Sequence, residues 1–284
     1  MREREEQIGG TILNHVTCYN YLGLTISASG QFNTAIKDLT DKARRVFYSI
    51  RRPLFKFNPS IKLWLKIFDS IIKPILLYGS EIWGPKFKLN YETWDKNPVE
   101  IFHLEFCKNI LGIHRNAPNL GCRAELGFTI TVLSLIGKNT QRQKVTQVKK
   151  LTYFYSIKSD YKLAPYLSSI KNYGHRKLLT KYRLSEHILS VETGRHKQSW
   201  RARELRLCSH CTESLIEDEL HFLTECSKYK HIRDAYFKQI ALVSPEFQQT
   251  SNTEKLSYIL GEKEKCIHLA TQYVYSCHQM REKD

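Results

Sequence analysis

The sequence predicts a mainly α-helical protein with a short β segment at its start and a small Cys/His-rich module in its last third. Three observations support this prediction. β-branched and aromatic residues with turn candidates occupy residues 12–26. Apolar residues then recur at helical spacing, and five Cys and His residues fall within residues 208–226. The 284-residue chain is 42% hydrophobic, which is enough for one large or two ordinary globular domains.

Helical periodicity begins at Asn33. The first expected helix has a basic outside and one apolar face, which comprises Ile36, Leu39, Ala43, Val46, Phe47 and Ile50. Ser60 is the expected N-cap of a second helix, which Pro74 should kink or end. A third helix should close at Gly112, because glycine favours the left-handed conformation that ends many helices.

The middle of the chain has weaker signals. Residues 84–98 suggest a loop, and residues 131–155 predict a longer helix. The pattern becomes irregular around residues 164–165 and 171–174, which we interpret as a domain boundary.

Positive charge dominates the composition. Lys and Arg number 44 against 28 Asp and Glu, which gives a formal net charge of +16 and a pI near 9.4. Such a chain attracts polyanions, so nucleic acid is the leading partner class and an anionic membrane surface is the alternative. Residues 171–206 hold ten Lys or Arg against three Glu, and either contact nucleic acid or form a solvated helix face. Side chains able to stack on bases are interleaved there: Tyr173, His175, Tyr182, His187 and Trp200.

The chain carries no signal for secretion or for crossing a membrane. Its amino terminus is charged and no apolar run follows it, so we expect an intracellular protein, nuclear or cytoplasmic. The most apolar stretch, residues 61–78, is interrupted by Lys, Asp and Pro and predicts a core helix. In a reducing compartment, the clustered cysteines are candidate metal ligands and the scattered ones are packing residues.

The clustered residues have the spacing Cys-x2-Cys-x9-His-x4-Cys. A pair of cysteines two residues apart lies on a tight turn that directs both thiolates inward, and a His and a Cys near a helical turn complete a tetrahedron. Four protein ligands leave no open coordination position, so the expected ion is one structural zinc. The predicted ligands are Cys208, Cys211, His221 and Cys226.

Two further groups of residues could bind a metal or support its ligands, an acidic run before His221 and a second Cys/His group. Glu217, Asp218 and Glu219 precede His221, and they either orient its imidazole or are exposed turn residues. A second Cys/His group has poor spacing on an expected helix, where its members face different directions, so we expect packing residues there. That group comprises Cys266, His268, Cys277 and His278.

The order of these segments resembles the carboxyl-terminal part of a LINE-type non-LTR retrotransposon reverse transcriptase. The likeness spans residues 21–237 and is carried by residues 21–26 (YLGLTI), 73–84 (KPILLYGSEIWG), 181–185 (KYRLS), 193–196 (TGRH) and 219–223 (ELHFL). Gly30 and Lys42-Ala43 follow the first block. The resemblance implies the end of the palm, a helical thumb and a zinc knuckle, which in that family grip nucleic acid.

This chain also departs from the pattern of the family that it resembles. Members of the family polymerise with paired aspartates on a palm hairpin, and this chain contains no Asp-Asp pair. We therefore expect no catalytic residues and no polymerase activity of its own. Some relatives carry an endonuclease after the knuckle, but Pro245-Glu246 is only a faint match and predicts an ordinary turn.

The expected organisation has five segments: residues 1–32, the palm end and β segment; 33–165, a helical thumb-like domain; 166–207, a basic linker; 208–240, the zinc knuckle; and 241–284, a helical tail. The residues expected to contact RNA or DNA phosphates, or else to be solvated surface charges, are Arg44, Arg45, Arg51, Arg52, Arg195, Lys197, Arg201, Arg203 and Arg206.

Two other functions stay open from the sequence. One is a protein-interaction module that uses the zinc knuckle and the acidic carboxyl-terminal part. The other is a nuclease, or half of a polymerase that works in trans, which the missing carboxylate pairs disfavour.

Overall fold

The computed structural model describes residues 7–8, 11–12, 16–84, 96–128, 150–158 and 160–283. Its helices are α1 (Asn33–Leu54), α2 (Ile61–Ile67), α3 (Lys73–Leu76), α4 (Ser80–Trp83), α5 (Pro98–Leu111), α6 (Asn119–Leu126), α7 (Phe154–Ile157), α8 (Pro165–Ser169), α9 (Tyr173–Arg183), α10 (Ser190–Thr193), α11 (Lys230–Val243), α12 (Asn252–Ile259) and α13 (Ile267–Glu282). The prediction of a mainly helical protein is confirmed.

The described strands form two small antiparallel ladders near the amino terminus. One pairs β1 (Gln7–Ile8) with β2 (Thr11–Ile12), and the other pairs β3 (Cys18–Tyr21) with β4 (Leu24–Ser27). Leu22 and Gly23 form the turn of the second hairpin, and both have positive φ angles. Leu24 turns inward from β4 and is buried, and β4 contacts α1. The short β segment expected before residue 32 is therefore present.

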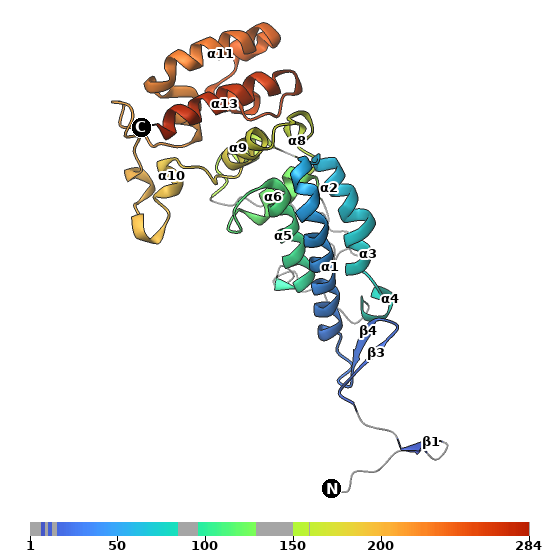
Figure 1. Ribbon diagram of the computed structural model, residues 1–284. Coiled ribbons are helices and arrows are strands. Elements are labelled where there is room, and N and C mark those ends of the chain that lie inside the picture. Colours follow the sequence, from blue (N-terminus) through green and yellow to red (C-terminus); the bar gives the residue numbers. More distant parts are fainter. Residues whose placement is uncertain are drawn as a thin grey trace.

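The centre of the molecule is a bundle in which α1 packs against α3 and α5 (Figure 1). The apolar face predicted for α1 is confirmed, with Ile36, Leu39, Ala43 and Phe47 buried and the other two members half-buried. Phe47 meets Phe106 of α5 in a T-shaped contact with 5.2 Å between ring centroids. Stripes of large apolar side chains on both helices thus form this part of the core.

The predicted helix ends in this bundle also agree with the structure. The Ser60 hydroxyl accepts a hydrogen bond from the Leu63 N–H, which makes Ser60 the N-cap of α2. Gly112 ends α5 with a φ of +71°. The chain stays helical through Pro74, but the α-helical hydrogen-bond pattern is interrupted just before it. A π turn at η2 (Phe68–Ile72) precedes α3, and Pro74 lies in the first turn of α3, where its missing N–H leaves no donor unpaired.

Two predictions for the middle of the chain fall mainly outside the described residues. The expected loop at residues 84–98 is described only at its two ends. The helix expected over residues 131–155 is described only from residue 150, where residues 150–153 are not helical and α7 begins at Phe154.

The segment predicted as a basic linker, residues 166–207, packs into the core over much of its length. Asn172 caps α9 by accepting from the His175 N–H, and α9 buries Leu178, Leu179 and Tyr182. One continuous hydrophobic core reaches from Leu24 in β4 to Cys277 in α13 and crosses the boundary that the irregular pattern suggested. The irregularity coincides with the junctions around α8 and α9.

The carboxyl-terminal helices form the opposite end of the molecule from the β3–β4 hairpin (Figure 1). α13 packs against α9, α11 and α12. A capping box at Ser251 and Glu254 fixes the start of α12. The structure thus places α13 inside the fold, whereas the sequence suggested a tail. Within the described part of the chain, no helix is long and apolar enough to cross a bilayer.

Candidate metal centre and basic surface

The four predicted metal ligands converge on one point. Their sulfur and nitrogen ligand atoms all lie within 4.8 Å of one another. The Sγ atoms of Cys208 and Cys226 are 3.9 Å apart, and Sγ of Cys211 lies 3.3 Å from Nε2 of His221. Zinc–sulfur bonds of about 2.3 Å in a tetrahedron place ligand atoms about 3.8 Å apart. The group therefore fits one tetrahedral metal ion.

The first two ligands come from a short loop that is closed by one β bridge. Leu207 and Ile216 form an antiparallel bridge, and the Cys208 N–H donates to the Leu215 carbonyl over 2.8 Å. Ser214 has a φ of +51°, which reverses the chain within this loop. The backbone therefore holds Cys208 at the base of the loop and brings Cys211 back toward it.

The other two ligands lie at the two ends of one π turn, since His221 begins η8 (His221–Glu225) and Cys226 follows it. The Asp218 carboxylate accepts a hydrogen bond from the His221 N–H over 3.1 Å at the start of the turn. The Cys226 N–H donates to the His221 carbonyl over 2.8 Å, which fixes Cys226 beside His221. Arg233 of α11 donates to the Cys226 carbonyl over 2.9 Å. The geometry of this half is thus set by hydrogen bonds that reach beyond the turn itself.

The centre is enclosed. Cys208, His221 and Cys226 are buried and Cys211 is half-buried. Burial is the largest cause that raises the pKa of the Cys226 thiol, and the neighbouring Cys208 adds to the effect. A bound cation would reverse this preference, because metal ions bind the thiolate and release the proton. With four protein ligands and no open position, the chemistry that the group supports is structural.

The carboxylate beside the His221 imidazole is Glu225, a residue that the sequence analysis did not select. Its Oε2 lies 4.0 Å from Nδ1 of His221, the ring nitrogen that faces away from the thiols. Glu225 follows His221 by four residues, which is the spacing that places two side chains on one face of a helical turn. This spacing is the feature of the sequence from which Glu225 could have been predicted.

Both interpretations of the acidic run before His221 are wrong. All three of its side chains are buried, so they are not exposed turn residues. None binds the imidazole of His221 either. Glu217 pairs with Arg281 of α13 over 2.8 Å, and Glu219 lies 2.9 Å from Nε2 of His187. The run instead attaches the metal segment to α13 and to the residues that follow α9.

The second Cys/His group does not come together. Cys266 and Cys277 are buried in the packing around α13, and His268 is exposed. His278 shares a hydrogen bond of 3.1 Å with the Tyr182 hydroxyl. Among the residues that the structure describes, the only group with metal-ligand spacing is the one at residues 208–226.

The predicted phosphate-contacting residues fall into two sets. Five of them have no ion pair within the described part of the chain: Arg45, Arg51, Arg52, Lys197 and Arg201. All of these are exposed except Arg51, which is half-buried with its guanidinium 5.0 Å from the Phe55 ring centroid.

The remaining four are engaged within the protein. Arg44 pairs with Glu105 over 3.1 Å and with Asp41 over 2.6 Å. Arg195 pairs with Glu192, and Arg203 with Asp218. Arg206 is buried, and its guanidinium donates to the carbonyls of Val191 and Arg201. Arg206 thus differs from the surface contact that the sequence suggested, because it holds the segment that leads into Cys208.

Two of the aromatic groups predicted to stack on bases are also internal. Tyr182 is buried and stacks on Phe222 at an interplanar angle of 3°, with His187 on its ring as well. Trp200 is 68% exposed and is free to meet a ligand.

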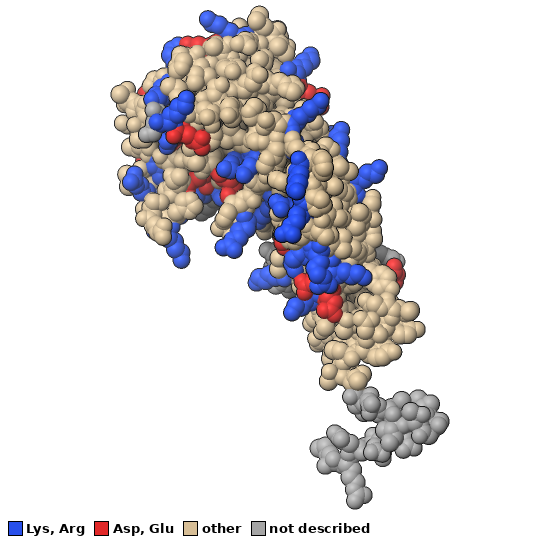
Figure 2. All heavy atoms as spheres, viewed as in Figure 1, with Lys and Arg blue, Asp and Glu red and all other residues tan. Residues whose placement is uncertain are grey.

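Figure 2 shows Lys and Arg side chains gathered over the middle of one face of the molecule, whereas the end with the β3–β4 hairpin has few. Comparison of the chain with models of known protein families, with curated proteins and with solved structures gives no match.

Proposed function

We propose that this protein binds nucleic acid through its basic surface and that one structural zinc ion stabilises the segment at residues 208–226. The observation that carries the proposal is the distribution of its cations. The chain has a formal charge of +16, and exposed arginines such as Arg45, Arg52 and Arg201 have no acidic partner within the described structure. Uncompensated Lys and Arg favour phosphate binding, because each contact releases counterions from the nucleic acid.

The metal centre supports this proposal indirectly. Its four ligands flank an acidic run in which Glu217 pairs with Arg281 of α13 and Glu219 contacts His187, which follows α9. Zinc is the ion that best fits three thiolates and one imidazole in a tetrahedral arrangement. The metal segment also contacts the residues just before it, because the Glu217 N–H donates to the Arg206 carbonyl and Asp218 pairs with Arg203. The bound ion would thus help to order the neighbouring basic stretch that includes Arg201.

We further propose that the chain corresponds to the thumb and zinc knuckle of a LINE-type reverse transcriptase, without polymerase activity of its own. The helical bundle after a short antiparallel hairpin, followed by a Cys3His group, supports this proposal. Asp38 and Asp41 both lie on α1, where they bind Thr25 and Arg44, and therefore do not form a carboxylate pair on a hairpin.

The decisive experiment is a salt titration of binding. Fluorescence anisotropy would follow the zinc-loaded protein with labelled 20-nucleotide RNA and DNA, each single-stranded and duplex. We expect affinity to fall steeply as salt rises from about 50 to 200 mM, because several phosphates are neutralised. Weak binding with a flat salt dependence would overturn the proposal.

A protein-interaction module is the second candidate function, and one observation favours it. The β3–β4 hairpin and the adjoining helices expose a group of apolar side chains at the uncharged end of the molecule, which comprises Tyr19, Tyr21, Leu22, Ile26, Tyr78 and Ile82. Exposed apolar patches mark protein contacts. The salt titration separates the two functions, since only phosphate contacts require a steep slope.

A further inference from the structure

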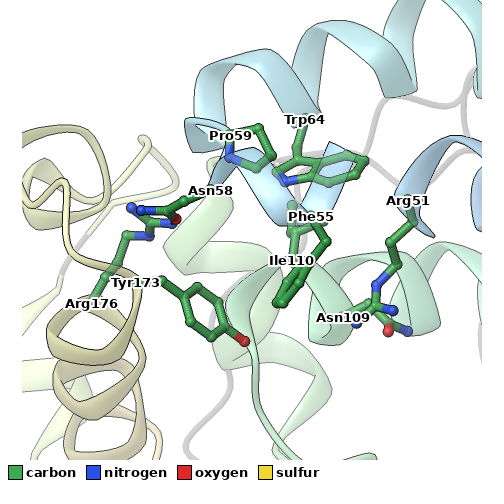
Figure 3. A pocket seen from close by; sticks show the side chains of 9 residues that line it. All are labelled: Arg51, Phe55, Asn58, Pro59, Trp64, Asn109, Ile110, Tyr173 and Arg176. Atoms are coloured by element: carbon green, nitrogen blue, oxygen red, sulfur yellow. The ribbon is translucent and has the colours of Figure 1, made fainter. Parts of the chain in front are cut away.

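A groove of about 680 Å³ runs along α5, between the end of α1 and the start of α9. We call it the α5 groove, and its polar lining comprises Arg51, Glu105, Lys108, Asn109, Arg115, Asn119 and Tyr173. A smaller pocket shares Arg51, Asn109 and Tyr173 with it and adds Phe55 and Trp64 (Figure 3). The groove therefore joins residues from three helices that are far apart in the sequence.

The cations of the α5 groove lack acidic partners. Arg51, Lys108 and Arg115 form no ion pair within the described residues. The one carboxylate in the lining, that of Glu105, is already bound by Arg44 over 3.1 Å and by the Tyr48 hydroxyl over 2.7 Å. The groove thus carries a net positive charge that an anion would compensate.

Among these cations, Lys108 most clearly favours binding of an anion in the groove. Its ammonium donates to the Arg115 carbonyl over 2.6 Å and to the Asn119 amide oxygen over 2.7 Å, which are both neutral acceptors. Partial burial lowers the pKa of Lys108. An ammonium that is partly desolvated and held by neutral oxygens gains most from a nearby phosphate.

An aromatic wall lies beside the cations. Figure 3 shows the Tyr173 ring directed toward Phe55 across the pocket, and the two rings meet edge to face at 5.2 Å. Phe55 is 41% exposed, and Phe57 in the same turn is 82% exposed. A Cβ at Gly112 would lie 2.2 Å from the Tyr173 hydroxyl, so the missing side chain at this glycine leaves room for the ring at the groove.

We propose that the α5 groove binds single-stranded nucleic acid. In this arrangement the phosphates lie along Arg51, Lys108 and Arg115, and an unpaired base stacks on Phe55 or Tyr173. Cations beside exposed aromatic rings recognise single strands, because the bases of a duplex are stacked on one another and cannot reach a protein ring. The inference rests on the proposed nucleic-acid binding and adds the site and the strand form.

The first test removes two cations of the groove. The Arg51→Gln/Arg115→Gln variant avoids the hydrogen bonds of Lys108, and a Lys37→Gln/Lys238→Gln variant removes the same charge from exposed positions on α1 and α11. With a labelled 20-nucleotide single strand, we expect the groove variant to bind about tenfold more weakly. Its salt slope should fall by about 1.4, for two lost contacts with a single strand. The matched variant should lose much less affinity. Equal losses of affinity in the two variants would overturn the proposal that the strand binds in the α5 groove.

The second test concerns the ring. Tyr173→Leu should weaken single-strand binding by about tenfold, while Tyr173→Phe should retain it, because stacking needs the ring and not the hydroxyl. Circular dichroism of both variants shows whether the fold is kept. A Tyr173→Leu variant that is folded and binds a single strand as the wild type does would contradict the stacking.

Photocrosslinking locates the strand directly. A single strand with 5-iodouracil should crosslink to peptides that contain Tyr173 or Phe55, and crosslinks confined to other regions would overturn the proposal. Absence of any salt-dependent nucleic-acid binding by the wild type would instead refute the proposed function. Tight binding of duplex alone would keep that function and refute the groove's preference for single strands.

Discussion

Arg183 of α9 and Glu125 of α6 form an ion pair in the interior of the protein, with Nε of the arginine 2.8 Å from Oε1 of the glutamate and neither side chain exposed. Arg183 also donates to the Leu260 carbonyl over 2.8 Å and pairs with Glu262 over 3.0 Å. Burial alone would lower the pKa of Arg183, but the two glutamates raise it, so the guanidinium stays charged. This residue joins the central bundle to the carboxyl-terminal helices.

Replacing this arginine should strongly destabilise the protein. Arg183→Met keeps an apolar chain of similar length but leaves Glu125 as an uncompensated buried charge, which costs about 3–5 kcal/mol in the free energy of unfolding. Urea denaturation followed by circular dichroism measures the loss.

The double variant Arg183→Met/Glu125→Leu provides the control for that prediction. It removes both charges, so we expect it to recover a large part of the lost stability. A double variant as unstable as the single one would show that lost packing, and not the unpaired charge, causes the effect.

The metal centre predicts a specific loss on changing one ligand. Wild-type protein should contain about one zinc per chain, and Cys211→Ser should contain almost none, because the remaining three ligands bind the ion far more weakly. Metal analysis of purified protein measures the content, and circular dichroism should show a partial loss of structure in the variant. Cys18→Ser is the matched control, since Cys18 is exposed and lies outside the site. Zinc-free wild-type protein with a complete fold would refute the centre.

Glu225 should tune the affinity of that centre. Its carboxylate lies 4.0 Å from Nδ1 of His221, a buried ring nitrogen that has no hydrogen-bond partner within the described structure. A carboxylate that closes this gap when the metal binds orients the imidazole and raises its basicity. Glu225→Gln should therefore lower zinc affinity by about 10- to 100-fold, as measured by competition with a chelator. Glu246→Gln removes an exposed carboxylate in η10 (Pro245–Gln249) and should leave the affinity unchanged. Equal zinc affinities in the two variants would show that Glu225 does not contribute to the metal site.

The features that the sequence predicted correctly are those set by neighbouring residues. The cap at Ser60, the end of α5 at Gly112 and the apolar face of α1 each depend on a few positions close in the chain. The convergence of the four Cys and His residues was predicted for the same reason, because they lie within residues 208–226. Local spacing therefore identified both the bundle helices and the Cys/His group.

The features that the sequence analysis missed depend on contacts between distant residues. A count of basic residues cannot distinguish Arg183, whose partners Glu125 and Glu262 lie 58 and 79 residues away, from the exposed Arg201. The acidic run was misread for the same reason, since Arg281 and His187 come from other elements. The α5 groove combines Tyr173 with α1 and α5, a juxtaposition that no local pattern shows.

His103 of α5 is a buried histidine whose environment disfavours the charged ring. Its ring stacks on Phe68 at 5.0 Å between centroids, and within the described structure neither ring nitrogen has a hydrogen-bond partner. The Glu100 carboxylate is 3.7 Å from Nδ1, but it is bound by Arg123 over 2.6 Å. Burial, the largest effect, lowers the pKa of His103, so the folded protein keeps the ring neutral.

This histidine should make the protein sensitive to acid. The unfolded chain binds a proton at His103 below pH about 6.5, whereas the folded state binds it only at lower pH, so stability falls as the pH drops through this range. His103→Phe keeps a ring against Phe68 without the titrating group. We therefore expect the wild type to lose more stability than the variant between pH 7 and 5, as measured by urea denaturation at each pH. His196→Phe, which changes an exposed histidine, should follow the wild type. Parallel stability curves for the wild type and His103→Phe would show that the ring does not titrate on unfolding.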